Sequence, residues 1–327
     1  MPGTRPHVVV VTPNPALDVT YTVEARDVAA PGGTVRVGSV LRRAGGKGLN
    51  VARVLHVLGL PVTAVQPLGG DAGAWIRREL ADLGLPTDTV DVPAPTRSTV
   101  TVVPTTPDGS PDAHPTVYAE PGPVLDAAAW DAVCVRVAAR CRPGDVLVVA
   151  GSLPPGAARL GPLVSAGRAA GAHVVVDTGG TALLDAARAG ADTLAPNAAE
   201  ARSATGTPTV DTAVAALLDL GAGRVVVSDG AAGLLATRRS PAGTVRQPAV
   251  PHVTGNPTGA GDAATAGLAA AVLAGADDAT ALRWAAVLGA AAVLRPGAGE
   301  VDPADLPVLD ARLDTRTGRT PRTEPPW

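Results

Sequence analysis

Short apolar runs alternate along this chain with longer stretches in which apolar residues recur at helical spacing. Residues 7–12 (HVVVVT) form a continuous apolar run, which is typical of a central strand buried on both faces. From residue 125 onward the alternation becomes regular. This pattern predicts an α/β fold with a mostly parallel central sheet between layers of helices. The expected strands are 7–12, 62–65, 146–150, 173–176, 192–195 and 224–227, and the expected helices include 126–141, 157–170, 181–189, 211–220, 260–274 and 278–294.

Two stretches, 19–43 and 96–119, depart from this rhythm and alternate only weakly between apolar and polar positions. They predict short strands, with a turn at residues 107–109 (PDG), that together form a small sheet covering a cleft. We expect residues 1–310 to form a single domain. The segment 311–327 is rich in Arg, Thr and Pro and is expected to be disordered.

The composition of the chain excludes some classes of binding partner but says little about the fold. The chain has 327 residues, 46% of them hydrophobic, and a net charge of −3 without a basic tract, which argues against nucleic acid or a membrane surface as a partner. No apolar run of 18 residues and no secretory signal pattern is present, so we expect a cytoplasmic protein. Cys134 and Cys141 lack a CxxC pattern and are expected to be plain core residues.

Lys47 is the only lysine among 27 lysine and arginine residues. It stands in the glycine-rich stretch 45–48 (GGKG), directly before an apolar helical pattern. A compact ammonium suits a phosphate that must be held as a point charge rather than gripped by a planar guanidinium.

A second glycine-rich helix entry, at residues 256–267, admits three interpretations. It could be a plain glycine turn in which Asp262 complements the helix dipole. Residues 259–264 could instead be a dinucleotide fingerprint (GxGxxA), although no buried strand precedes them. Alternatively, the loop forms an anion hole for a migrating phosphoryl group, and Asp262 is the base that receives the acceptor's proton.

Single polar residues follow several expected strands, where ligands bind in open α/β sheets. Asp18 could hydrogen-bond a polar ligand or be an ordinary turn residue. Asn197 and Glu200 lie three residues apart and could order a hydrated magnesium ion, or could be a helix cap with an acid in the first turn. Arg97 is either an anion binder or a solvated arginine.

Several kinds of catalytic site are absent from the sequence. It contains no Walker A motif, HExxH or GxSxG, and its five histidines include no pair four residues apart. Glycine-lined helix starts, single acids and one lysine remain. Phosphoryl transfer needs little more than positioning, cations, backbone N–H dipoles and a base.

Taken together, these residues make the chain resemble the ribokinase-like (PfkB) carbohydrate kinases over nearly its whole length. Within that family it is most similar to the branch of 1-phosphofructokinases and tagatose-6-phosphate kinases. The resemblance rests on five motifs in the family's order, at residues 12–18 (TPNPALD), 45–52 (GGKGLNVA), 151–156 (GSLPPG), 196–200 (PNAAE) and 258–262 (TGAGD).

The resemblance implies a three-layer α/β/α fold with a β-sheet lid, and it implies ATP and Mg²⁺ as cofactors. The lid often forms a dimer contact in this family, which makes a homodimer possible. The implied catalytic residues are Asp262 as base, with Gly259, Ala260 and Gly261 as the anion hole. The implied acceptor-binding residues are Asp18, Gly46, Lys47, Asn50, Arg97 and Ser152. The implied nucleotide-binding residues are Asn197, Ser228, Gly230, Gly233, Thr258 and Gly261, and Asn197 and Glu200 are also tied to the metal.

The expected reaction is phosphorylation of a ketohexose phosphate, with fructose 1-phosphate as first candidate. Tagatose 6-phosphate, fructose 6-phosphate and an unphosphorylated sugar or nucleoside are alternatives, as is a catalytically silent sugar-phosphate-binding protein. A dinucleotide-dependent oxidoreductase is a more distant interpretation. The chain departs from the branch's pattern in carrying Ala195 and Thr34 where relatives have lysine, and in lacking an arginine at residues 115–118.

Overall fold

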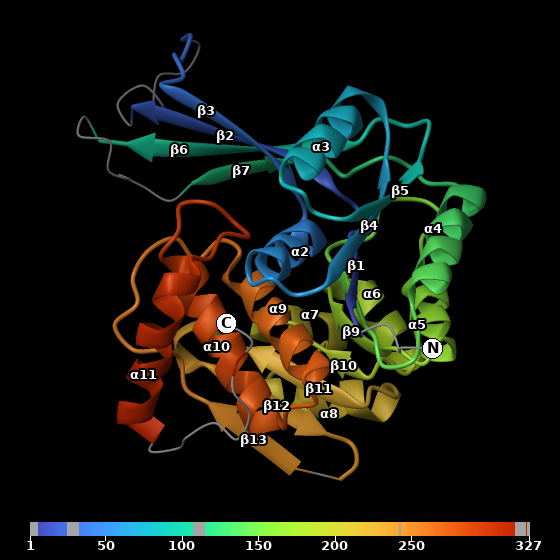
Figure 1. The fold of residues 1–327 in the computed structure, drawn as a ribbon, viewed down its shortest axis with the longest axis vertical. Coiled ribbons are helices and arrows are strands. Elements are labelled where there is room, and N and C mark those ends of the chain that lie inside the picture. The colour runs from blue at the N-terminus through green and yellow to red at the C-terminus, as the bar shows by residue number, and fades with distance from the viewer. Residues whose placement is uncertain (1–5, 25–32, 107–114, 242, 318–324, 326–327) are drawn as a thin grey trace.

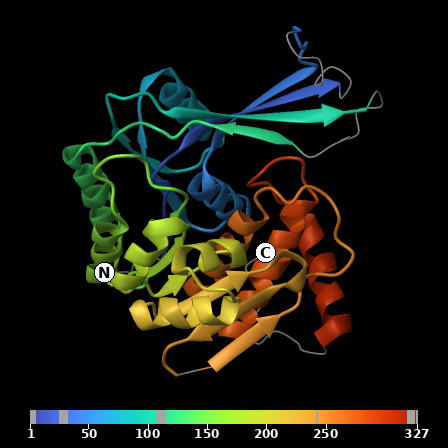
Figure 2. The same cartoon turned by 180° about the vertical axis from the view of Figure 1, so that it is seen from behind.

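A computed structural model describes residues 6–24, 33–106, 115–241, 243–317 and 325 (Figure 1). Within these residues the strands form two sheets, a large central one and a smaller one that projects from it (Figures 1 and 2). The predicted α/β architecture with a mostly parallel sheet and a separate small sheet is therefore confirmed. No helix in the described ranges has the length and apolar character needed to cross a membrane.

The central sheet has the strand order β13-β12-β11-β10-β9-β8-β1-β4-β5. All neighbours from β11 to β5 pair in parallel, whereas β12 and β13 add an antiparallel edge. The strands are β1 (Val8–Val11), β4 (Val62–Leu68), β5 (Thr87–Asp91), β8 (Val146–Ala150), β9 (His173–Asp177), β10 (Thr193–Leu194), β11 (Arg224–Ser228), β12 (Leu234–Arg238) and β13 (Gly243–Gln247).

Two helical layers bury the two faces of this sheet, which explains why β1 is apolar at every position. Val8 and Val10 pack on one layer and Val9 and Val11 on the other. The first layer comprises α2 (Lys47–Val57), α3 (Gly70–Asp82), α9 (Ala260–Leu273), α10 (Asp278–Val293) and α11 (Leu306–Thr317). The second comprises α4 (Ala127–Arg140), α5 (Leu160–Ala169), α6 (Gly180–Arg188), α7 (Ala198–Thr205) and α8 (Val210–Leu220).

The small sheet, called the lid below, has the order β3-β2-β6-β7. It is built from β2 (Ala16–Glu24), β3 (Ser39–Gly45), β6 (Arg97–Thr105) and β7 (Thr116–Ala119). The predicted lid segments 19–43 and 96–119 contain most of these strands, but β2 begins earlier and takes in Asp18, and β3 ends later, at Gly45. The predicted turn at 107–109 lies outside the described residues.

Two expectations from the sequence differ from the structure. Residues 311–317 were expected to be disordered, but they continue helix α11, because Leu309 and Leu313 are buried and Arg283 pairs with Asp310 and Asp314. Strand β5 was not predicted, because its sequence TDTVD has only one apolar residue. It forms by pairing in parallel with β4 at the sheet edge, so tertiary context overrides its weak propensity.

Candidate active site

The candidate active site lies at the carboxyl ends of the central strands. Asn14 follows β1, Ser152 follows β8 and Asn197 follows β10, while Asp177 and Ser228 are the last residues of β9 and β11. Parallel strands place their carboxyl ends at one edge, so polar residues far apart in sequence meet there. The N-termini of α2 and α9 face the same edge and bring Lys47 and Asp262 to it.

The loop before α9 has the geometry of an anion site. Gly259 has φ 83°, which favours glycine, and a Cβ built there would lie 2.8 Å from Ala298 Cα. The N–H of Ala260 donates to the carbonyl of Pro257. Among the described residues no hydrogen-bond acceptor is found for the backbone N–H groups of Gly261 and Asp262. Two donors at the positive end of a helix are therefore available to a phosphoryl oxygen.

Asp262 is buried behind these donors, with 6% of its surface exposed. Its Oδ2 accepts a hydrogen bond from Asn50 Nδ2 at 2.7 Å. Burial and the nearby charge of Asp177 raise the pKa of Asp262 to about 7, against the opposing effects of Asn50 and Lys47. A carboxylate with this pKa can accept a proton near neutral pH, as a general base must.

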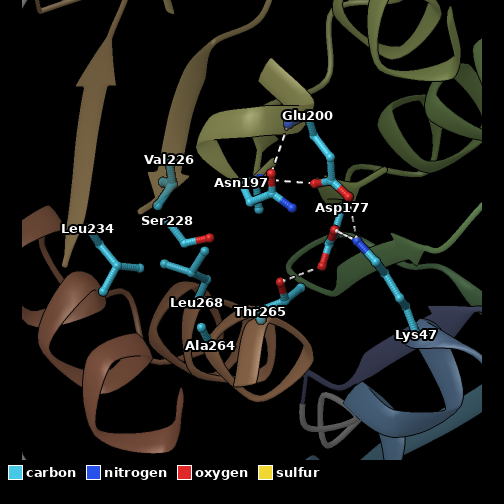
Figure 3. Close-up of a pocket in the computed structure, with 12 residues that line it drawn as sticks. Lys47, Asp177, Asn197, Glu200, Val226, Ser228, Leu234, Ala264, Thr265 and Leu268 are labelled. Carbon is cyan, nitrogen blue, oxygen red and sulfur yellow. Dashed lines mark hydrogen bonds and ion pairs between the residues drawn. The ribbon is translucent and has the colours of Figure 1, made fainter. Parts of the chain in front are cut away.

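Lys47 is held by two carboxylates (Figure 3). Its Nζ lies 2.9 Å from Asp177 Oδ1 and 3.2 Å from Glu200 Oε1. Burial alone would lower the pKa of Lys47, but these two carboxylates outweigh burial and raise it above its usual range. The ammonium therefore stays charged and faces the pocket that also contains Asn197 and Ser228. Lys47, which the resemblance assigns to the acceptor sugar, thus lines the same pocket as two residues assigned to the nucleotide.

Asp177 and Thr265 belong to this cluster, although the sequence singled out neither as a site residue. Asp177 is almost fully buried, and its Oδ2 accepts a hydrogen bond from Thr265 Oγ1 at 2.9 Å. Burial raises the pKa of Asp177, while Lys47 opposes the shift. The position of Asp177 directly after a predicted strand could have identified it as a site residue. Thr265 follows Asp262 by three residues and so lies on the same side of α9.

Asn197 and Glu200 form the reciprocal helix cap that the sequence left as one of two interpretations. Asn197 Oδ1 accepts from the Glu200 N–H at 2.8 Å, and Glu200 Oε2 accepts from the Asn197 N–H at 3.0 Å. The other Glu200 oxygen contacts Lys47. Asp177 and Glu200 thus converge on one positive charge, so oxygen donors suited to magnesium are present beside the cap. In the part of the chain described, no three His, Cys, Asp or Glu side chains are grouped so that they could hold a metal ion.

The pocket beside this cluster has one polar and one apolar side (Figure 3). Val226, Leu234, Ala264 and Leu268 form the apolar side, which could receive a flat ring system. The full lining is Lys47, Asp177, Ala195, Asn197, Glu200, Val226, Ser228, Leu234, Gly261, Ala264, Thr265 and Leu268.

Three predicted nucleotide-binding residues lie outside this lining. Gly230 and Gly233 have positive φ values of 49° and 92° in the turn between β11 and β12. Thr258 is exposed, and its N–H donates to Asn256 Oδ1 at 3.0 Å.

A second cluster, on the lid side, contains Asp18 and Arg97. The Arg97 guanidinium donates to the backbone carbonyls of Asn14 and Glu120, at distances from 3.0 to 3.3 Å. Because these acceptors are uncharged, and no carboxylate within the described ranges forms an ion pair with Arg97, its positive charge is not cancelled by a direct partner. Burial raises the pKa of Asp18 to about 6, partly offset by the charge of Arg97. The Arg97 charge is therefore available to a polar ligand, beside an Asp18 carboxyl that interacts with the Thr99 side chain.

The remaining predicted acceptor residues border this cluster. Gly46 has φ 105° at the start of α2, and a Cβ there would lie 2.9 Å from Thr12 Cγ2. Ser152 is exposed, and its Oγ accepts from Asn14 Nδ2 at 3.3 Å. Asn50 donates to Asp262, as described above.

The fold and the site thus define an α/β protein whose polar strand ends gather near a buried carboxylate at a helix N-terminus. The chain matches the pfkB family of carbohydrate kinases over residues 12–305 and belongs to that family, as the sequence predicted.

Two curated relatives and one solved structure illustrate which members of the family this chain is similar to. The 1-phosphofructokinase of Xanthomonas campestris is 36% identical over 86% of this chain and 88% of that protein. The ATP-dependent 6-phosphofructokinase isozyme 2 of Mycobacterium tuberculosis is also 36% identical, but over only 47% of this chain and 43% of that protein. The phosphofructokinase-2 of Escherichia coli in complex with fructose-6-phosphate superposes with a TM-score of 0.82, at 28% identity, covering 95% of this chain and 100% of that one.

Proposed function

We propose that this protein is an ATP-dependent sugar kinase that phosphorylates a hydroxyl of a ketohexose phosphate. The observation that carries the proposal is the position of Asp262. Its buried carboxyl, with a pKa of about 7, lies beside the unpaired N–H groups at the start of α9. The Lys47 pocket and the Asp18–Arg97 cluster provide the two ligand regions that such a transfer requires.

In the proposed reaction Asp262 accepts the proton of the acceptor hydroxyl. The hydroxyl oxygen forms a bond to the terminal phosphorus of ATP, and the bond from that phosphorus to the bridging oxygen breaks to release ADP. The N–H groups of Gly261 and Asp262 stabilise charge on the moving phosphoryl group, with Gly259 and Ala260 shaping the turn. Lys47 supplies a positive charge between the two ligand regions.

The nucleotide is proposed to occupy the pocket lined by Asn197 and Ser228, with Gly230, Gly233 and Thr258 at its rim. Asn197 and Glu200 would hold magnesium, which when bound supplies positive charge to the phosphates. The acceptor would contact Asp18, Gly46, Asn50, Arg97 and Ser152, and Arg97 would pair with its phosphate.

Fructose 1-phosphate is the first candidate acceptor, because the 1-phosphofructokinase of Xanthomonas campestris is a curated relative that aligns over most of both chains. Fructose 6-phosphate is the second, supported by the Mycobacterium and Escherichia relatives. A substrate panel tests the proposal by measuring ADP release with fructose 1-phosphate, fructose 6-phosphate, tagatose 6-phosphate, fructose and ribose. Asp262→Asn is the background control. If a free sugar is turned over faster than every sugar phosphate, the acceptor is an unphosphorylated sugar. If no acceptor is turned over, the protein is a sugar-phosphate-binding protein without kinase activity.

We also propose that the lid forms a homodimer contact. Val40, Leu41, Val117 and Tyr118 are large apolar side chains on its strands, and each has 44% to 63% of its surface exposed. Sedimentation equilibrium of the wild type and of Tyr118→Asp tests this. A dimer that becomes a monomer in the variant supports the proposal, and a monomeric wild type refutes it.

A further inference from the structure

Asn14 lies where the lid meets the α/β body. The lid is joined to the body at four points: before β2, after β3, before β6 and after β7. Asn14 precedes β2 by two residues. After β3, Gly46 lies next to this segment, since a Cβ built there would come within van der Waals distance of Pro15 Cα, at 3.4 Å, and of the Asn14 carbonyl oxygen, at 3.6 Å. Two of the four junctions therefore lie side by side at Asn14.

The other two junctions reach Asn14 through hydrogen bonds. Arg97, the first residue of β6, donates from Nε and from a terminal nitrogen to the Asn14 carbonyl, at 3.3 and 3.2 Å. After β7, the carbonyl of Pro121 accepts from Asn14 Nδ2 at 3.0 Å. All four junctions of the lid thus converge on one residue, and its side chain holds the junction after β7.

The same amide also reaches the body of the site. Asn14 Nδ2 donates to Ser152 Oγ at 3.3 Å, so the same nitrogen connects the segment after β7 to the loop after β8. The side chain is tightly enclosed, because Asn14 is only 4% exposed and a Cβ on Gly122 would lie 2.2 Å from its Oδ1. That Oδ1 has no hydrogen-bond partner among the described residues. Burying an unpaired amide oxygen costs free energy, so an apolar side chain would fill this space better if packing were the only requirement.

We propose that Asn14 is a positioning residue that fixes the lid's hinge relative to the Ser152 loop, and so aligns Arg97 and Ser152 with the acceptor. This inference rests on the proposed function for its effect on acceptor binding. Its structural part, the control of lid opening, stands independently of any reaction.

Asn14→Ala tests both parts. Losing the Pro121 and Ser152 contacts should loosen the lid, so amide hydrogen exchange in β6 and β7 should become faster while exchange in β8 and β9 stays unchanged. The KM for the acceptor should rise about tenfold, with the KM for ATP changed less than twofold, because a misaligned acceptor residue weakens the acceptor site alone. Thr105→Val is the matched control, since it removes a buried hydrogen bond inside the lid, from Thr105 Oγ1 to the Val23 carbonyl at 3.1 Å, far from the hinge.

Asn14→Asp separates the two contacts and covers the case in which Asn14→Ala does not fold. The aspartate can accept a hydrogen bond from the Ser152 hydroxyl, which reverses the wild-type direction, but it cannot donate one to the Pro121 carbonyl. Faster lid exchange with a raised acceptor KM in this variant supports the hinge role. The hinge role would be overturned if Asn14→Asp kept the wild-type rate of lid exchange and the wild-type acceptor KM. It would also be overturned if Thr105→Val changed both quantities as much as the Asn14 variants do. If wild-type protein turns over no acceptor, the kinase proposal fails, and unchanged lid exchange in both Asn14 variants is then the result that overturns the hinge.

Discussion

Asn50 Nδ2 donates a hydrogen bond to Asp262 Oδ2 at 2.7 Å, which ties helix α2 to helix α9 at the centre of the site. This bond favours the ionised carboxylate and therefore lowers the pKa of Asp262 against the effect of burial. Asn50→Leu removes the donor with little change in volume. We expect the acid limb of the pH profile of kcat/KM to move to higher pH, and an unchanged midpoint would show that Asn50 does not tune the base.

In the wild type, the pH dependence of activity should follow the pKa of about 7 of Asp262. The base works only when ionised, so kcat/KM should fall about tenfold per pH unit below that value. The measurement is a profile of kcat/KM between pH 5 and 9 with a pH-independent assay for ADP. A flat profile down to pH 5 would contradict the base role.

Asp262→Asn should lower kcat on the order of 10²-fold or more, because the amide cannot accept the hydroxyl proton. Its carbonyl can still accept the hydrogen bond from Asn50, so the local structure should persist. ATP binding measured by calorimetry should remain near the wild-type value. Near-normal turnover in this variant would remove Asp262 from the role of base.

The same substitution should make the protein more stable at pH 8. The pKa of Asp262 rises from 3.8 in the unfolded chain to about 7 in the folded protein, so the folded state binds the proton more tightly. Wild-type stability from this group is therefore present at low pH and lost as pH rises through 7. Asparagine avoids burying a charge, and the gain in unfolding free energy at pH 8 could reach about 4 kcal/mol. Urea unfolding of both proteins should show this difference at pH 8 and little difference at pH 4.

The sequence predicted the layers and the strand-end loops well because burial leaves a regular trace in apolar patterning. It did not predict β5 or the helical residues 311–317, since these depend on pairing with β4 and on the ion pairs of Arg283. Tertiary contacts of this kind have no local signal.

The motifs named candidate residues for the site, but they did not predict the contacts among those residues. Lys47 was identified as an unusual charge, yet its partner Asp177 lies 130 positions away and becomes its neighbour only when β9 and α2 meet at the sheet edge. Asn14 lies inside one of the five motifs, but no local pattern indicates that the lid's junctions converge on it.

Lys47→Ala should weaken both stability and nucleotide use. The substitution leaves the buried carboxylate of Asp177 without its cation, and because Lys47 is 36% exposed we expect a loss of about 1–3 kcal/mol rather than the full cost of a buried pair. The KM for ATP should rise more than the KM for the acceptor, since the ammonium faces the pocket of Asn197 and Ser228. Lys47→Arg is the control for charge alone. If the KM for a phosphorylated acceptor rises more than the KM for ATP, Lys47 binds the acceptor rather than the nucleotide.

Arg97→Gln should discriminate between acceptors with and without a phosphate. The Arg97 guanidinium is bound by backbone carbonyls rather than by a carboxylate, so its charge remains available to a phosphate. A charge-assisted hydrogen bond contributes about 1.5–3 kcal/mol, so the KM for a phosphorylated ketohexose should rise roughly 10- to 100-fold while that for free fructose changes little. Arg42→Gln, on the exposed strand β3, is the matched control for losing a lid arginine. Equal losses with fructose and fructose 1-phosphate in Arg97→Gln would mean that Arg97 supports the lid hinge and does not read the acceptor's phosphate.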